Sequence, residues 1–87
     1  MRLKAVSTNT NQYGLDVEFY DGSITTVDLR EWIETGGDIL MSLRDPLIFK
    51  QFKIIDYGCA LQWNDDEDLA IDAIHLSELS RNVHSQV

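Results

Sequence analysis

The sequence predicts a small α+β domain built on an antiparallel sheet of two hairpins, with about four to five strands, short helices and a C-terminal helix. Two features predict the hairpins: a run of alternating apolar and polar residues that stops at Asp21-Gly22, and two β-rich segments separated by Gly58-Cys59. A helical spacing of apolar residues after Asp68 predicts the last helix. Because 87 residues suit one domain, we expect a single domain over residues 1–81 and a flexible tail over residues 82–87.

The length of the first hairpin loop follows from the parity of its apolar residues, because paired residues in a hairpin have a constant sum of residue numbers. A two-residue loop, Asp21-Gly22, makes this sum odd and would place part of the apolar set on the acidic face. A three-residue loop, Tyr20-Asp21-Gly22, makes it even and gathers these side chains on one face: Leu15, Val17, Phe19, Val27 and Leu29. We therefore expect the three-residue loop, with Gly22 in the left-handed conformation and Asp21 as a structural turn residue.

The segment between the two hairpins predicts short helices. Residues 30–34 can form little more than one helical turn before Gly36-Gly37, a strong stop signal. Asp45-Pro46 is typical of an N-cap followed by proline at the first helical position, which predicts a short helix over residues 47–51.

The second hairpin is expected to pair residues 52–57 with residues 60–63. After it, Asp68 is a plausible N-cap for a helix whose apolar stripe has approximately helical spacing: Ile71, Ile74, His75 and Leu79.

Charge and cysteine content narrow the classes of function. Fifteen acidic and seven basic residues give a net charge of −8, which opposes direct binding to nucleic acid. A loose basic group, Arg44, Lys50 and Lys53, either contacts an anionic partner or is a solvated face. No apolar run is long enough for a membrane span or a signal peptide. The single cysteine, Cys59, is typical of a protein in a reducing compartment, and we expect its side chain to be buried. We expect a cytoplasmic protein.

The densest carboxylate cluster allows two interpretations. It consists of Asp65, Asp66, Glu67, Asp68 and Asp72, and carboxylate oxygens are the ligands that Ca²⁺ and Mg²⁺ prefer. The acids are consecutive and contain no glycine, unlike an EF-hand loop. Asp65, Asp66, Asp68 and Asp72 are therefore weak metal-ligand candidates, and a solvated acidic loop with a helix cap is the alternative.

No residue pattern indicates catalysis. Cys59 has no neighbouring base in the sequence that would form a thiolate, and His75 and His84 are not spaced as paired helical metal ligands. No set of serine, histidine and aspartate stands out. We expect no enzymatic activity and no cofactor.

A series of short motifs runs along residues 3–76: Val17-Glu18-Phe19-Tyr20-Asp21-Gly22, Val27-Asp28-Leu29, Leu43-Arg44-Asp45, Phe49, Trp63, Asp68-Leu69 and Asp72-Ala73-Ile74. In order and approximate spacing the series resembles the bacterial family known as domain of unknown function 2442. Two positions depart from the usual pattern of that family, because Asn64 stands where a proline is common and His75 where an aromatic residue is common.

The resemblance implies a small bacterial α+β domain with no established enzymatic activity or cofactor. Some relatives look like the sensory half of helix-turn-helix proteins, and others like one partner of small toxin–antitoxin-type pairs. Because the segment after Leu76 is too short for a DNA-binding domain, the resemblance favours a protein-binding module over a DNA reader.

Two hypotheses of function follow. The first is a non-enzymatic module that holds a protein partner, expected to be basic, and that resembles an antitoxin in its acidity. Its candidate contact residues are Trp32, Trp63, Asp65, Asp66 and Glu67, with core packing as the alternative for the two tryptophans. Homodimerisation through a sheet edge is compatible with it. The second hypothesis is a small-ligand or metal-sensing domain that uses the acidic loop over residues 65–72.

Overall fold

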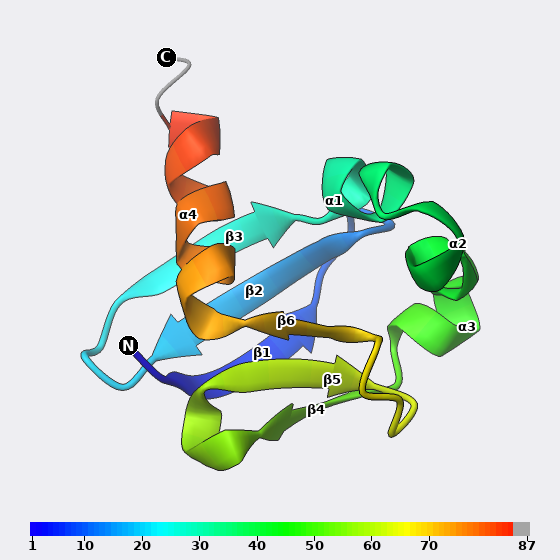
Figure 1. The fold of residues 1–87 in the computed structure, drawn as a ribbon. Helices are drawn as coiled ribbons and strands as arrows, with labels where there is room; N and C mark the ends of the chain where they lie inside the picture. Colours follow the sequence, from blue (N-terminus) through cyan, green and yellow to red (C-terminus); the bar gives the residue numbers. More distant parts are fainter. Residues whose placement is uncertain (85–87) are drawn as a thin grey trace.

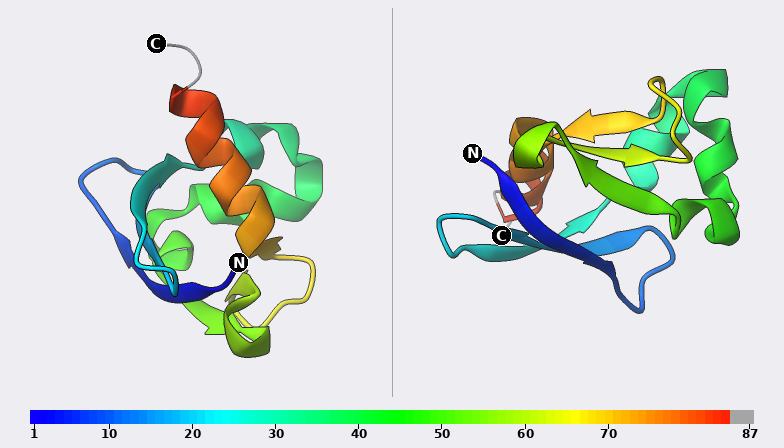
Figure 2. Two further views of the ribbon diagram at one scale, coloured as in Figure 1. Left: turned by 90° about the vertical axis from the view of Figure 1, so that its left-hand side faces the viewer. Right: turned by 90° about the horizontal axis from the view of Figure 1, so that it is seen from below.

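The computed structural model describes the backbone of residues 1–84 and the side chains of residues 1–80. Its strands form two three-stranded antiparallel sheets, which face each other across the core (Figures 1 and 2). The first sheet has the order β1-β2-β3, with β1 at Leu3–Thr8, β2 at Gly14–Phe19 and β3 at Ile24–Asp28. The second has the order β4-β5-β6, with β4 at Phe52–Ile55, β5 at Ala60–Trp63 and β6 at Ala70–Asp72.

The helices lie at opposite ends of the two sheets (Figure 1). The first group is α1 (Arg30–Thr35), α2 (Gly37–Leu40), the 3₁₀ turn η1 (Met41–Arg44) and α3 (Pro46–Phe49). At the other end, α4 (Ala73–His84) crosses beside β3, where the hydroxyls of Thr25 and Ser80 are hydrogen bonded. A second 3₁₀ turn, η2 (Asp56–Gly58), connects β4 to β5. The predicted α+β fold class is confirmed.

One hydrophobic core joins the sheets and helices. Trp63 lies within it with no exposed surface, and its Nε1–H donates to the carbonyl of Phe49 at 2.8 Å. The indole lies 5.9 Å from the Phe49 ring and 5.8 Å from the Trp32 ring, measured between ring centroids. A buried tryptophan of this kind contributes apolar burial while its N–H remains satisfied.

The first hairpin has the predicted register. Leu15 pairs with Val27 and Glu18 with Ile24, so each pair has the even sum that a three-residue loop requires. The Phe19 amide donates to the Ser23 carbonyl at 2.9 Å, and Gly22 has a φ of +91°. The expected apolar set is buried on the inner face of the sheet: Leu15, Val17, Phe19, Val27 and Leu29.

Two strands were absent from the sequence prediction. Strand β1 was missed because a bulge between Leu3 and Ala5 breaks the alternation of apolar and polar residues that indicates a strand. Strand β6 was missed because it has only three residues and because Ile71 matches the helical spacing of the segment that follows. The described residues therefore contain six strands rather than the expected four to five.

The prediction that the last helix begins after Asp68 was wrong. The helix begins at Ala73, and the Asp72 carboxylate is its cap, since its Oδ1 accepts a hydrogen bond from the His75 amide at 2.7 Å. Ile74, a member of the predicted stripe, is 61% exposed, whereas Leu76 is buried. The flexible tail expected over residues 82–87 overlaps the end of α4 and stays a prediction, and residues 85–87 lie outside the described part of the chain.

The helices between the hairpins follow the sequence signals with local differences. Asp45 caps α3 as expected, because its Oδ1 accepts from the Leu47 amide at 2.9 Å and Pro46 is the first helical residue. The helix ends at Phe49, two residues earlier than expected, because Lys50 caps it. The helix end predicted at Gly36-Gly37 is a kink between two helices. Helix α1 ends at Thr35 and α2 begins at Gly37, which has a φ of +64°.

The second hairpin pairs Phe52 with Trp63 and Ile55 with Ala60, so the two predicted segments do pair, although the connection between them is longer than the expected Gly58-Cys59. Its first strand ends at Ile55 rather than Tyr57, because residues 56–58 form η2. Cys59 is exposed, contrary to the expectation that it is buried, because it follows this turn at the edge of β5.

In the described residues, no helix has the length and apolar character needed to cross a membrane.

Replacing Gly22 tests the bulged loop. A Cβ at this position would contact nothing within 4 Å, so the cost of Gly22→Val comes from the positive φ. We expect a loss of about 1–3 kcal/mol in the free energy of unfolding, measured by chemical denaturation. Gly22→Asn is the matched control and should lose less, because asparagine adopts the left-handed conformation more readily. Equal stability of Gly22→Val and the wild type would contradict this assignment.

A pair of alanine substitutions tests the start of α4. Asp72→Ala removes the cap and should lower the free energy of unfolding by about 1 kcal/mol. Asp68→Ala removes an exposed carboxylate four residues earlier and should change the stability little. The opposite ranking in thermal or chemical denaturation would place the cap at Asp68.

Candidate protein-interaction surface

Several segments that carry exposed apolar side chains lie at the end of the molecule with the hairpin turns. Eight large apolar side chains are exposed among residues 1–80, and five of them belong to what we call the turn-end surface: Met1, Tyr20, Ile24, Tyr57 and Ile74. In Figure 2 (left), the N-terminus, the β2–β3 loop, η2 and the start of α4 lie together on the side that faces the viewer. The other three, Ile39, Met41 and Leu47, lie on the helices at the opposite end.

Backbone contacts hold the segments of the turn-end surface together. The Tyr20 amide donates to the Arg2 carbonyl at 3.0 Å, and the Arg2 guanidinium lies 5.4 Å from the centroid of the Tyr20 ring. The Ala73 amide donates to the Cys59 carbonyl at 2.8 Å, which joins the start of α4 to the end of η2. These contacts fix the β2–β3 loop to the N-terminal strand, and α4 to the second hairpin.

Gly58 allows η2 to lie directly against β1. A Cβ at Gly58 would lie 2.7 Å from the carbonyl oxygen of Leu3, closer than side chains approach backbone atoms, and Gly58 has a φ of +93°. Glycine is therefore required at this position both for its backbone conformation and for the close approach of η2 to β1.

Tyr57 is the most exposed large apolar side chain of this surface. It is 92% exposed and has a φ of +57°, between Asp56 at +53° and Gly58 at +93°. Non-glycine residues in the left-handed region are uncommon and cost of order 1 kcal/mol or more each. The turn thus holds an aromatic ring in solvent, where it contributes little to the core and is available for contact.

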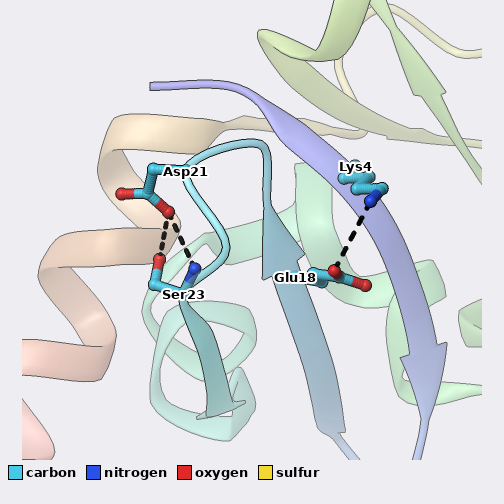
Figure 3. Close-up of polar contacts among 4 residues, drawn as sticks. All are labelled: Lys4, Glu18, Asp21 and Ser23. Atoms are coloured by element: carbon cyan, nitrogen blue, oxygen red, sulfur yellow. Dashed lines mark hydrogen bonds and ion pairs between the residues drawn. The ribbon is translucent and has the colours of Figure 1, made fainter.

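The β2–β3 loop of this surface carries a hydrogen-bonded carboxylate, Asp21. The backbone and hydroxyl of Ser23 both donate to Asp21 Oδ1, at 2.9 Å and 2.6 Å (Figure 3). These hydrogen bonds, the side-chain bond first, hold the pKa of the Asp21 carboxyl below its usual value. Nearby on the sheet, Lys4 Nζ lies 3.8 Å from Glu18 Oε2.

The partner-binding candidates from the sequence occupy other places. Trp63 is fully buried and packs in the core, and Trp32 is half-buried between Trp63 and His75. The acidic residues of 65–67 are exposed on the β5–β6 loop, at the far end of the strands from η2. None of these residues belongs to the turn-end surface.

The metal-ligand candidates each make a separate local contact. Asp65 pairs with Lys53, Asp66 Oδ1 accepts from the Asp68 amide at 2.9 Å, and Asp72 caps α4. Within the described residues, no three histidine, cysteine, aspartate or glutamate side chains are placed to hold one metal ion. The loop geometry therefore gives the metal-sensing hypothesis no convergent set of ligands.

The basic group of the sequence is divided in the structure. Arg44, Lys50 and Lys53 line three different surface depressions. Arg44 lines the same depression as Arg30, which is fourteen positions earlier in the chain, so proximity in the sequence did not indicate which basic residues share a depression.

Sequence reasoning also missed most of the turn-end surface. Two signals in the sequence could have indicated it: the even parity of the first hairpin implies that Ile24 lies on the outer face, and Tyr57 directly precedes the glycine of a predicted hairpin turn. The meeting of these residues depends on contacts between segments distant in sequence.

A known protein family matches most of the chain. Residues 6–77 match the family model described as Protein of unknown function (DUF2442). The chain belongs to this family. The resemblance inferred from its motifs is therefore confirmed. No curated protein matches the chain.

A solved structure shares the fold of this family member. It is the crystal structure of "Putative DNA Binding Protein NE0471" from Nitrosomonas europaea ATCC 19718, with a TM-score of 0.80 and 19% sequence identity. The similarity covers 97% of this chain and 51% of that protein, so the chain spans about half of the other protein's length. At this identity the likeness establishes the fold.

The Asp21 carboxylate gives a prediction for the acid range. Because its folded pKa is lowered, its contribution to stability is complete above the usual aspartate pKa and is lost as the pH falls through the folded value. Asp21→Asn should therefore reduce the dependence of the free energy of unfolding on pH below the usual aspartate pKa. Identical acid profiles for wild type and Asp21→Asn would contradict the assignment.

Proposed function

We propose that this domain is a non-enzymatic protein-interaction module that binds its partner through the turn-end surface. The observation that supports this function most directly is Tyr57, which is 92% exposed in a left-handed conformation. Tyrosine is enriched among the residues that dominate binding energy at protein interfaces, because it buries a large area with few rotatable bonds. A buried partner contact would offset the conformational cost of the turn.

The remaining apolar residues extend this contact area. Tyr20, Ile24 and Ile74 are 61%, 73% and 61% exposed, and they come from three different elements. Apolar side chains grouped within a polar surround are typical of interaction sites on proteins, whereas single exposed apolar residues are ordinary. Arg2 already covers one face of the Tyr20 ring, which leaves the other face for a partner.

Charge favours a basic partner. The chain has a net charge of −8, and Asp21, Asp56 and Asp72 belong to the same turns and helix start as the turn-end surface. Complementary charge increases the rate of association and selects between partners. An acidic domain that masks a small basic protein would behave as the antitoxin-like partner expected from the sequence.

The solved structure with the same fold is named as a putative DNA-binding protein, and about half of that protein lies outside the region similar to this chain. The same acidic charge repels phosphate, so we infer that a domain of this kind would serve a DNA-binding assembly by contacting protein rather than DNA. Fluorescence anisotropy with duplex DNA at low salt tests this inference, and saturable binding by the domain itself would contradict it.

Co-expression with the products of neighbouring genes tests the proposed function. We expect one of them to be basic, to co-purify with this chain and to bind more weakly as salt increases. Tyr57→Asn should weaken that binding by about tenfold or more, measured by titration calorimetry, because a central aromatic contact contributes more than about 1 kcal/mol. Asparagine suits the left-handed turn, so the fold should be preserved.

Leu47→Asn is the matched control for this experiment. Leu47 is 70% exposed at the opposite end of the molecule, and its replacement should leave the affinity unchanged. Equal affinity of Tyr57→Asn and wild type, or a loss confined to Leu47→Asn, would exclude the turn-end surface. Light scattering of the purified chain tests whether a second copy competes for the same surface as a homodimer.

A further inference from the structure

A second site lies at the opposite end of the molecule, where the β1–β2 loop meets α1 and η1. A surface pocket of about 440 Å³ is lined there by Gln12, Tyr13, Arg30, Ile33, Glu34 and Arg44, which we call the arginine pocket. Its volume falls within the range of about 300–1,000 Å³ found for small-molecule sites. The turn-end surface contributes no residue to it.

The arginine pocket concentrates positive charge on an acidic protein. Two of the seven basic residues of the chain line it, although the net charge is −8. The ion pairs found among residues 1–80 are Lys4 with Glu18 and Lys53 with Asp65, so neither pocket arginine is neutralised by a carboxylate within this part of the chain. Both guanidiniums therefore keep their donors available for a bound group.

Tyr13 is held rigidly as one wall of the pocket. Its hydroxyl donates to the Arg44 carbonyl at 3.1 Å and accepts from Gln12 Nε2 at 3.1 Å. Its carbonyl accepts from the Leu29 amide at 2.9 Å, and its ring packs edge-on against Phe49 at 5.7 Å between centroids. The Arg30 guanidinium carbon lies over the same ring, 5.4 Å from its centroid. Tyr13 thereby contacts both arginine residues, the Arg30 guanidinium through its ring and the Arg44 backbone through its hydroxyl.

We infer that the arginine pocket binds a small organic anion, with a carboxylate or phosphate on the guanidiniums and a planar or apolar body against Tyr13 and Ile33. Guanidinium groups match the geometry of both acids with paired hydrogen bonds and also stack on flat groups. Glu34 lies in the wall as well, so the lining has a net charge of +1 from two arginines and one glutamate. Glu34 opposes the anion and limits its affinity.

Two aromatic anions can probe the site by nuclear magnetic resonance. Benzoate and phenyl phosphate, added to the full chain at constant ionic strength, should cause saturable shifts in the amides of Tyr13, Arg30, Ile33 and Arg44. Benzamide has the same ring without the charge and should cause weak shifts. Saturation with benzoate but not phenyl phosphate, or the reverse, identifies which acid group the site takes and supports the inference.

Charge variants of the lining separate binding from structure. Arg44→Gln and Arg30→Gln should each weaken the bound probe about tenfold, since a hydrogen bond to a charged group contributes about 1.5–3 kcal/mol. Glu34→Gln should instead increase the affinity for the probe, because it removes a negative charge from the lining. A loss of structure would lower the affinity. Lys53→Gln is the control, because it removes the same charge from β4 and should leave the affinity unchanged.

Three results would overturn the inference. They are the absence of saturable shifts at the pocket amides with either probe, shifts spread evenly over all basic side chains, and an equal loss of affinity in Lys53→Gln and Arg44→Gln. Each of these leaves the turn-end surface untouched, so the two sites are tested independently.

Discussion

The burial of Trp63 is the contact on which the rest of the structure depends. This side chain ends β5, and its ring contacts Trp32 from α1, Phe49 from α3 and Phe52 from β4. Its N–H is satisfied by the Phe49 carbonyl, so the indole is buried without leaving a polar group unpaired. The second sheet and the group of short helices are thereby fixed to each other, although none of these helices exceeds six residues.

Such short helices would be unstable in isolation, because helix formation needs more residues than they contain. Their positions depend on the buried side chains that they supply to the core, including Ile33, Leu40, Leu43 and Phe49. Once these anchors are in place, the exposed side chains of α1 and η1 form a rigid rim. The arginine pocket follows from this arrangement, since Arg30 and Arg44 extend from the helices whose opposite faces are buried.

The two ends of the molecule therefore have different chemical characters. The turn end presents aromatic and aliphatic side chains with acidic neighbours, and its turns contain three consecutive residues with positive φ from Asp56 to Gly58. The helical end presents a pocket lined by two arginines and by Tyr13, whose hydroxyl is hydrogen bonded to the Arg44 carbonyl. The sheets lie between the turn-end surface and the arginine pocket, so the two proposed sites share no residues.

Much of the fold was determined by the sequence itself. Parity fixed the register and the loop of the first hairpin, Asp45-Pro46 fixed the start of α3, and the order of motifs indicated the family. These features are local, because strand alternation, capping and left-handed glycine depend on neighbouring residues. The tertiary structure decided the rest. It made residues 70–72 a strand by pairing them with β5, and it brought Gly58 against Leu3 and Arg30 into one pocket with Arg44. These contacts form when segments far apart in the sequence pack together, and local sequence patterns do not encode which segments pack against each other.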